Sequence, residues 1–299
     1  MKKIIFFGTP NFSIPILSKL IDSKYEIVSV FTKPAKKSNR GQKVLKSGIH
    51  KFAEKFKLDI KTPENIKSEI NFIKNSKIDL GIVVAYGQII PESILNSCKY
   101  GFINIHASLL PKYRGAAPIQ RSLINLEKFT GVSFMKMNHK LDSGPVFNKY
   151  QIKIDEKDNN ETLSSKLSQL GSDKIIQNIE NIFLKKAKFE EQSHEEATYA
   201  NKINKKEGKI DWKESAKKII GKIRGLSPNP GAWFTFENER YKILDAELSS
   251  LNGEAGSVLD KNFTVGCGIN SITISVIQRQ GKNPQKTKEF LLGSKIKKG

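Results

Sequence analysis

The sequence predicts an α/β protein with a doubly wound, mostly parallel sheet domain of the Rossmann-like kind, followed by a small β-barrel domain of the OB-like kind. Three observations lead to this fold class. In the first half, short apolar runs alternate with amphipathic stretches, as in a parallel sheet covered by helices. A polar, charged stretch follows. After it come short apolar segments separated by Gly and Asn, which are typical of a small barrel.

The elements of the first half follow from the spacing of the apolar residues. Residues 78–85 are apolar almost without interruption, as expected for a strand buried on both faces of a sheet. Residues 162–183 carry apolar side chains at helical spacing, which indicates a long amphipathic helix. By the same criteria we expect strands at residues 3–7, 26–32, 78–85, 101–107, 131–137 and 145–154, and helices at residues 12–21, 49–56 and 162–183.

The second half begins after a stretch with few apolar side chains, residues 185–198, which we interpret as part of a linker. The expected domain boundaries are therefore 1–187 for the sheet domain, 188–203 for the linker and 204–299 for the barrel. Within the barrel domain we expect a helix at residues 215–224 and strands at residues 234–236, 241–246, 256–259, 263–267 and 271–278.

Composition narrows the class of partner. The 299 residues carry 51 Lys and Arg against 30 Asp and Glu, a formal charge of +21, which favours a polyanion such as nucleic acid. A lysine-rich genome would raise the same count. Cys98 and Cys267 stand outside any CxxC pattern, so we expect no disulfide framework and a cytoplasmic location. No apolar stretch approaches the ~18 residues of a membrane span, so no membrane partner is expected.

One cluster carries residues suited to acyl transfer. Asn104 and His106 are two apart on an expected strand, so both project from one face near its carboxyl end, where ligands bind in such sheets. Asp142 follows in a turn before Gly144. An amide can stabilise an oxyanion, and an imidazole and a carboxylate can transfer a proton. On these residues alone, a structural histidine and an ordinary turn aspartate remain open.

Two kinds of cofactor are not expected. The turn Gly8-Thr9-Pro10 follows the first strand but is not a GxGxxG sequence, and no P-loop is present, which argues against a dinucleotide. The histidines outside the cluster are scattered rather than at ligand spacing, so no metal is expected.

Residues 104–120, with 130–132 and 141–144, closely resemble the methionyl-tRNA formyltransferases. The shorter core of Asn-x-His, Ser-Leu-Leu-Pro and a later Asp resembles all formyltetrahydrofolate-using transferases, whereas the extension at residues 114–120 resembles the tRNA enzymes specifically. The resemblance implies a formyltransferase-type fold. It also implies transfer of the formyl group of 10-formyltetrahydrofolate to initiator methionyl-tRNA, for translation initiation. The implied mechanism needs no metal, and we expect a monomer.

The same resemblance assigns residues. It places the catalytic groups at Asn104, His106 and Asp142. In the implied mechanism, Asn104 and protonated His106 stabilise the oxyanion formed when the methionyl amine attacks, and Asp142 helps to remove the amine proton. The implied contacts with the folate are Ser108, Leu109, Leu110, Pro111, Gln88, Ile89 and Ile90.

The chain departs from the family pattern in two places. Asn138 and His139 stand where the family commonly has an Asp, and Asn229 stands where an aromatic residue is expected. His139 lies three residues before Asp142, where an incidental surface histidine is the simpler interpretation.

A basic segment is the expected contact with tRNA. Residues 33–51 hold seven Lys or Arg and no acid, with Ser, Asn and Gly that suggest a loop. Such a loop can guide a phosphate backbone, although a solvated loop of biased composition would look similar. In the family this loop reaches the acceptor end of the tRNA. The resemblance then implies tRNA contacts at Arg40, at the loop tip, and at Lys36, Lys37 and Lys43.

Other functions share parts of this pattern. A formyltransferase acting on a small amine, such as an amino-sugar nucleotide, would share the catalytic residues without needing the basic loop. A formyltetrahydrofolate hydrolase would share them too. A non-catalytic RNA-binding module on a retired formyltransferase scaffold would have no need for all three residue types in place.

Overall fold

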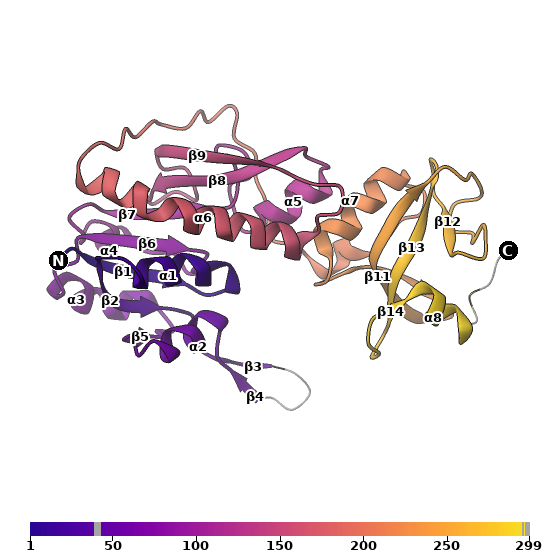
Figure 1. Ribbon diagram of the computed structural model, residues 1–299, viewed down its shortest axis with the longest axis horizontal. Coiled ribbons are helices and arrows are strands. Elements are labelled where there is room, and N and C mark those ends of the chain that lie inside the picture. Colours follow the sequence, from indigo (N-terminus) through magenta and orange to yellow (C-terminus); the bar gives the residue numbers. More distant parts are fainter. Residues whose placement is uncertain (39–42, 295, 297–299) are drawn as a thin grey trace. The chain divides into compact units, whose positions relative to one another are not determined.

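The computed structural model describes residues 1–38, 43–294 and 296. The chain forms two compact units (Figure 1). The first contains residues 1–115, 130–152 and 164–199, and the second contains residues 116–129, 153–163 and 200–299.

The first unit is built around one large sheet with helices on its faces. Its strands are β1 (Lys3–Gly8), β2 (Glu26–Phe31), β5 (Ile60–Lys61), β6 (Leu80–Val84), β7 (Phe102–His106), β8 (Phe129–Lys136) and β9 (Val146–Lys153). A separate antiparallel pair is formed by β3 (Lys36–Ser38) and β4 (Lys43–Leu45). Its helices are α1 (Ile14–Ile21), α2 (Gly48–Lys55), α3 (Ile70–Asn75), α4 (Glu92–Leu95) and α6 (Asn160–Phe183), with 3₁₀ turns η1 (Asn11–Ser13) and η2 (Ile66–Glu69).

The strand order confirms the predicted doubly wound sheet. It runs β5-β2-β1-β6-β7-β8-β9, parallel from β5 to β7, with β8 antiparallel to β7. The chain builds outward from β1 to β2 and β5, then returns to add β6 and β7 on the other side of β1. Ligands bind in such sheets beyond the carboxyl ends of the strands, at the point where the order reverses. The topology therefore predicts a ligand site in the loops that follow β1, β6 and β7.

One set of alternate residues of β1 packs against helices α3 and α4. Ile5 and Phe7 lie in one buried cluster with Ile73 of α3 and Ile94 of α4. The Phe7 ring stacks on that of Phe31 in β2, with centroids 4.7 Å apart. A strand with apolar residues at every position can pack in this way because successive side chains point to opposite faces.

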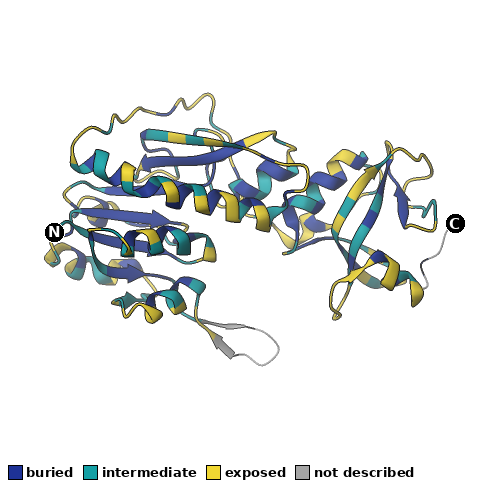
Figure 2. Ribbon diagram, viewed as in Figure 1, coloured by how far each residue is buried: buried dark blue, intermediate teal, exposed yellow. Residues whose placement is uncertain are grey.

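Helix α6 covers the other face of the sheet together with α1. Its small residues allow a close approach: the Oγ atoms of Ser168 and Ser172 donate hydrogen bonds to the carbonyls of Phe12 and Pro15, at 2.6 and 2.9 Å. A Cβ added at Gly171 would lie 3.2 Å from Ile16 of α1. The helix is amphipathic as predicted, with a buried stripe and an exposed one (Figure 2).

The second unit is an antiparallel sheet with helices, as predicted for the OB-like barrel. Its strands run in the order β10-β11-β13-β12, with β14 paired to β13. They enclose a core that includes Ile243, Ile272 and Ile274. Its elements are α5 (Pro118–Ile124), η3 (Lys205–Gly208), α7 (Ala216–Leu226), β10 (Ala232–Phe236), β11 (Glu239–Ser249), β12 (Thr264–Gly266), β13 (Ser271–Arg279), β14 (Gln285–Lys286) and α8 (Thr287–Leu292).

Helix α5 was not predicted from the sequence, yet it belongs to the second unit through α7. A Cβ added at Gly221 or Gly225 of α7 would lie 2.8 Å from the carbonyl oxygens of Ile124 and Gln120, respectively. These two glycines therefore let the helix backbones touch. A helix of seven residues that begins at Pro118 gives too short a pattern for periodicity to identify.

Two local predictions are wrong. The strand expected at residues 256–259 is not formed; only a single bridge joins Val258 to Val265. Gly256 there has φ +90, which interrupts the extended backbone. The segment still lies beside β12, for example through the Leu259 N–H bond to the Thr264 carbonyl at 2.7 Å, without forming a regular strand. The basic segment is not simply a loop, because β3 and β4 pair within it. Arg40 lies outside the described residues.

Both cysteines are free and buried. Burial raises the pKa of the Cys98 thiol to about 12 and that of Cys267 to about 11. Both therefore stay protonated and weakly nucleophilic at neutral pH. Across the described residues, no helix combines the length and apolar character that a membrane span needs.

The ion pair between Lys2 and Asp79 anchors the start of the sheet. Asp79, just before β6, accepts hydrogen bonds from Lys2 Nζ at 2.8 Å and from the Lys3 N–H at 3.0 Å. Burial acts to raise the pKa of this carboxyl, but the bonds from Lys2 and Lys3 and the lysine charges together outweigh it, so the pKa is lowered. A lowered carboxyl pKa stabilises the folded state above the unfolded-state pKa and ceases to do so as the pH falls.

Asp79→Asn should therefore lower the free energy of unfolding at pH 7 by about 1–2 kcal/mol, the scale of a charge-assisted hydrogen bond. The deficit should be complete above about pH 5 and should disappear as the pH falls below ~4, through the folded-state pKa. Urea unfolding at several pH values measures it. The exposed Asp22→Asn is the matched control and should leave the midpoint in place. Equal midpoints for the Asp79→Asn and parent proteins at pH 7 would refute the assignment.

Candidate active site

The predicted cluster forms at the carboxyl end of β7. This strand is flanked by β6 and β8, and Asn104 pairs in register with Val83 on one side and Met135 on the other. Asn104 and His106 are 8% and 6% exposed, so their backbones and side chains are held firmly. The turn that follows β8 brings Asp142 to the same place.

The three predicted catalytic side chains are in contact. Asn104 Nδ2 donates to Asp142 Oδ1 at 3.2 Å. His106 Nδ1 lies 3.7 Å from Asp142 Oδ2, and the Gly115 N–H donates to that same oxygen at 2.8 Å. An amide, an imidazole and a carboxylate therefore converge, with the carboxylate as the common member.

The imidazole of His106 is oriented by a backbone carbonyl. Its Nε2 lies 2.9 Å from the carbonyl oxygen of Tyr113. A carbonyl oxygen only accepts, so Nε2 carries a proton and donates it there. Nδ1 is then the nitrogen that faces Asp142. Because 3.7 Å exceeds hydrogen-bond length, Nδ1 is not hydrogen-bonded to Asp142 and can bond a substrate group that lies beside both side chains.

The loop that follows β7 has a rigid framework of hydroxyl contacts. Ser108 is fully buried, and its Oγ donates to the Lys112 carbonyl at 2.6 Å. Ser133 donates to the Ser108 carbonyl at 2.7 Å and accepts from the Leu110 N–H at 3.0 Å. Leu110 is buried against Met135. Leu109 and Pro111 are the partly exposed members of the predicted folate loop.

The other predicted folate contacts follow β6. Gln88 is committed to the protein, since its amide accepts from the Ile66 N–H at 3.1 Å and donates to the Pro63 carbonyl at 2.9 Å. Ile90 is buried in the core, whereas Ile89 is 89% exposed. Of the three side chains, Ile89 is the one that offers free apolar surface to a ligand.

The remaining predicted positions are only partly described. Lys36 and Lys37 lie on β3, and Lys43 lies on β4, where it pairs with Ser38. His139 is exposed, and none of the contacts found among the described residues joins it to Asp142. In the described part of the chain no group of three His, Cys, Asp or Glu is arranged to hold a metal ion.

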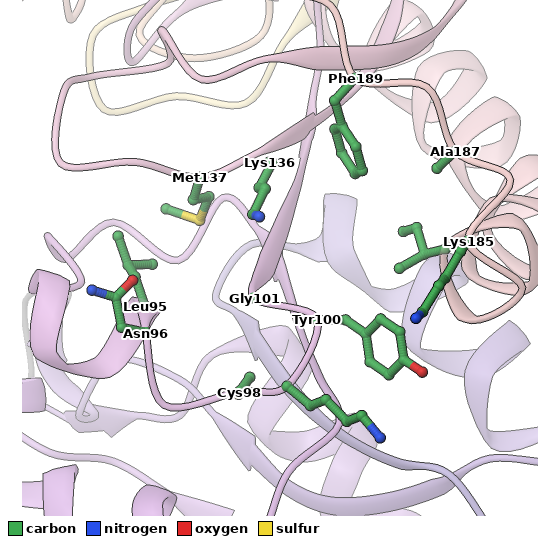
Figure 3. A pocket seen from close by; sticks show the side chains of 12 residues that line it. Leu95, Asn96, Cys98, Tyr100, Gly101, Lys136, Met137, Lys185, Ala187 and Phe189 are labelled. Carbon is green, nitrogen blue, oxygen red and sulfur yellow. The ribbon is translucent and has the colours of Figure 1, made fainter.

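A hollow of about 420 Å³ lies elsewhere in the first unit (Figure 3). Tyr100 and Gly101, which precede β7, and Lys136, which ends β8, line it. It therefore opens at the end of the sheet where the parallel strands begin, opposite the predicted catalytic residues. Its basic groups are exposed lysines, so no buried polar group converges on a ligand there.

Sequence reasoning missed the contribution of residues 188–199, which it treated as linker. Glu190 pairs with Val146 at the start of β9. Thr198 accepts a hydrogen bond from the Tyr113 N–H at 2.9 Å and so supports the carbonyl that orients His106. Buried Gln192 reaches the Asp142 turn. Polar side chains in a charged stretch show no periodic pattern in the sequence. Their role becomes visible only in the structure, where this stretch packs against the site.

Comparison with known proteins identifies the family of the chain. A family model described as formyl transferase matches residues 2–179, and one described as formyl transferase, C-terminal domain, matches residues 202–295. The chain is 57% identical over 302 residues to the methionyl-tRNA formyltransferase of Pelagibacter ubique (strain HTCC1062), covering 100% of this chain and 97% of that protein.

Solved structures share the fold at low identity. The N-formyltransferase from Helicobacter canadensis, in complex with folinic acid and dTDP-3-aminofucose, has a TM-score of 0.71 at 18% identity over 93% of this chain and 100% of that one. HypX from Aquifex aeolicus, in complex with tetrahydrofolic acid, has a TM-score of 0.69 at 15% identity. That match covers 97% of this chain and 47% of HypX, so the chain spans about half its length. On its sequence matches, the chain belongs to the formyl transferase family, within the methionyl-tRNA formyltransferases.

Proposed function

We propose that the chain transfers the formyl group of 10-formyltetrahydrofolate to the amino group of initiator methionyl-tRNA. The observation that carries this proposal is the convergence of Asn104, His106 and Asp142 at the carboxyl end of β7. The full-length identity to a methionyl-tRNA formyltransferase supports tRNA as the acceptor, and the net charge of +21 suits a polyanionic substrate.

Asn104 and His106 stabilise negative charge on the formyl oxygen. Asn104 Nδ2 has two N–H groups, and its contact with Asp142 uses one of them. His106, when protonated, donates through Nε2 to Tyr113 and keeps its Nδ1 proton for the oxygen. Fixed donors of this kind stabilise the transition state because they need no reorganisation as charge develops.

Asp142 acts on the attacking amine. Its carboxylate accepts one proton as the nitrogen forms its bond to the formyl carbon. The bond from that carbon to the folate nitrogen then breaks, and the leaving nitrogen takes up the proton that Asp142 accepted, so the carboxylate is regenerated and the transfer is balanced. Because Asp142 already bonds Asn104 and Gly115, its position is set before substrates bind, which lowers the entropic part of the barrier.

The donor site is proposed at the adjoining loops. Residues 88–90 follow β6 and residues 108–111 follow β7, and these strands are neighbours in the sheet. Exposed Ile89 and the partly exposed Leu109 and Pro111 offer apolar surface for the flat pterin ring. The bound folate supplies the activated formyl group.

The acceptor site is proposed to include the basic segment. Lys36, Lys37 and Lys43 lie on the β3–β4 pair, and Arg40 lies in the segment between these strands. We propose residues 1–187 as the catalytic domain and 204–299 as a tRNA-binding domain. Residues 188–203 connect the two and also contribute Gln192 and Thr198 to the site.

The decisive assay mixes purified protein with 10-formyltetrahydrofolate and methionyl-tRNA and measures formyl-methionine. A formylated product supports the proposal. Formylation of an amino-sugar nucleotide but not of tRNA would favour the small-amine alternative. Release of formate without transfer would identify a hydrolase, and RNA binding without either reaction would identify a non-catalytic module.

His106→Ala should lower kcat by about 30- to 1,000-fold, equivalent to a barrier increase of ~2–4 kcal/mol from loss of a proton-handling donor. The KM for the folate should change little. The exposed His139→Ala is the control and should retain parent activity. A His106→Ala enzyme with near-parent kcat would exclude the assigned role.

Asp142→Asn should lower kcat by about 100-fold or more, since an amide cannot accept the amine proton as a carboxylate can. The substitution keeps the shape of the side chain. Single-turnover formylation at saturating substrates measures it, with circular dichroism to verify folding. If the variant turned over at the parent rate, Asp142 would not be the base.

Arg40→Ala should raise the KM for methionyl-tRNA by about 5- to 10-fold and lower the salt slope of tRNA binding by about one, as expected for one lost phosphate contact. Folate binding should be unchanged. The exposed Lys67→Ala, on η2, is the matched control. Equal weakening of tRNA and folate binding by Arg40→Ala would contradict the role in tRNA binding.

A further inference from the structure

The guanidinium of Arg114 is buried next to Gln192, which contacts the Asp142–Gly144 turn, hereafter the catalytic turn. Among the ion pairs of the described residues, none joins this guanidinium to a carboxylate. Arg114 is 2% exposed. Its Nε and Nη2 donate to Gln192 Oε1 at 3.0 and 2.8 Å, and its Nη1 lies 3.3 Å from His194 Nδ1. Burial of a charged group whose hydrogen-bond partners are neutral costs free energy. Packing alone therefore does not explain why an arginine is found here.

Gln192 connects this guanidinium to the catalytic turn. Its Nε2 donates to the carbonyl oxygens of Asp142 and Gly144, at 3.0 and 2.7 Å. A guanidinium only donates, and a carbonyl oxygen only accepts. The amide therefore has one satisfied orientation, because the reversed amide would place donors against donors and an acceptor against acceptors. Arg114 thus fixes Gln192, and Gln192 fixes two carbonyls of the turn.

The turn needs such support because its backbone is unfavourable. Asp142 has φ 45, in the left-handed region that costs a non-glycine residue about 1–3 kcal/mol. A Cβ added at Gly144 would lie 1.8 Å from the Lys136 carbonyl, so the turn also presses closely on the end of β8. The Asp142 carboxylate in turn accepts the N–H of Gly115, the residue after Arg114.

We propose that Gln192, held by the buried Arg114 guanidinium, is a positioning residue that sets the backbone of the Asp142 turn and thereby the placement of its carboxylate against His106. Gln192 does not contact the reacting groups itself; it acts through Asp142. The inference rests on the proposed function where it is tested by enzyme kinetics. Where it is tested by a crystal structure, it rests only on the geometry of the turn.

The test compares two substitutions of Gln192. Gln192→Ala removes the contacts with both Arg114 and the turn. Gln192→Glu keeps an acceptor for Arg114, and with it the fold, but sets a carboxylate oxygen against the two carbonyls it should support. Both variants should lose about 10- to 100-fold in kcat, as expected when a catalytic group is displaced by about 1 Å, with the KM for 10-formyltetrahydrofolate within about threefold of the parent value. Gln151→Ala and Gln151→Glu, at an exposed position on β9, are the matched controls.

A double-mutant cycle tests whether the effect passes through Asp142. If it does, adding Gln192→Glu to Asp142→Asn should cost little further rate in single turnovers, because the carboxylate that Gln192 positions is already absent. Additive losses, or a Gln192→Glu enzyme with parent kcat, would overturn the proposal.

A crystal structure of Gln192→Glu provides a readout independent of activity. The Asp142–Gly144 turn should shift, and the Asp142 carboxylate should move away from His106. An unchanged turn would overturn the positioning role even if the parent protein formylated tRNA. A displaced turn in a protein inactive on methionyl-tRNA would leave the positioning role supported and count against the proposed function alone.

Discussion

The carboxylate of Asp142 is the junction on which the arrangement of the site depends. It accepts hydrogen bonds from Asn104 on β7 and from the N–H of Gly115 in the loop after β7, and it faces His106. Two stretches of chain that are distant in sequence, residues 104–115 and the turn that holds Asp142, therefore meet at one pair of oxygens. A charged acceptor makes hydrogen bonds roughly twice as strong as neutral ones, which suits the two roles proposed for Asp142, organising the site and accepting a proton.

The sheet explains why these groups can be held so firmly. Strand β7 is paired on both sides, so the positions of Asn104 and His106 are set by backbone ladders. The adjoining loops contribute what the strands cannot: a carbonyl from Tyr113 that orients the imidazole and apolar surface at Ile89. This division is the usual one in doubly wound sheets, where a rigid core positions functional loops at the carboxyl ends of the strands.

The sequence predicted the strand members of the site more readily than the rest. Asn104 and His106 are two residues apart on a strand, and this spacing places both side chains on the same face. Asp142 lies 38 residues from Asn104 in an ordinary-looking turn. Its residue type made it a candidate, but the family resemblance was needed to prefer a catalytic role over that of a turn former. Gln192 lies in a polar stretch that looked like linker, 50 residues from Asp142, and no local pattern reports such a contact. Helix α5 was missed, and a strand at residues 256–259 was wrongly predicted, for a related reason: contacts with other parts of the chain decide the structure of such short segments.

The chemistry of residue 192 follows from what it joins. On one side is a guanidinium that can only donate, and on the other are two carbonyl oxygens that can only accept. A group between them must accept at one end and donate twice at the other, which a primary amide does and a carboxylate, an ammonium or a hydroxyl does not. A carboxylate would pair better with Arg114 but would repel the turn, and it would add a negative charge beside the one that Asp142 must carry. Glutamine thus forgoes the stronger ion pair with Arg114 but donates hydrogen bonds to both carbonyls of the catalytic turn. This explains why the buried arginine is bonded to neutral partners.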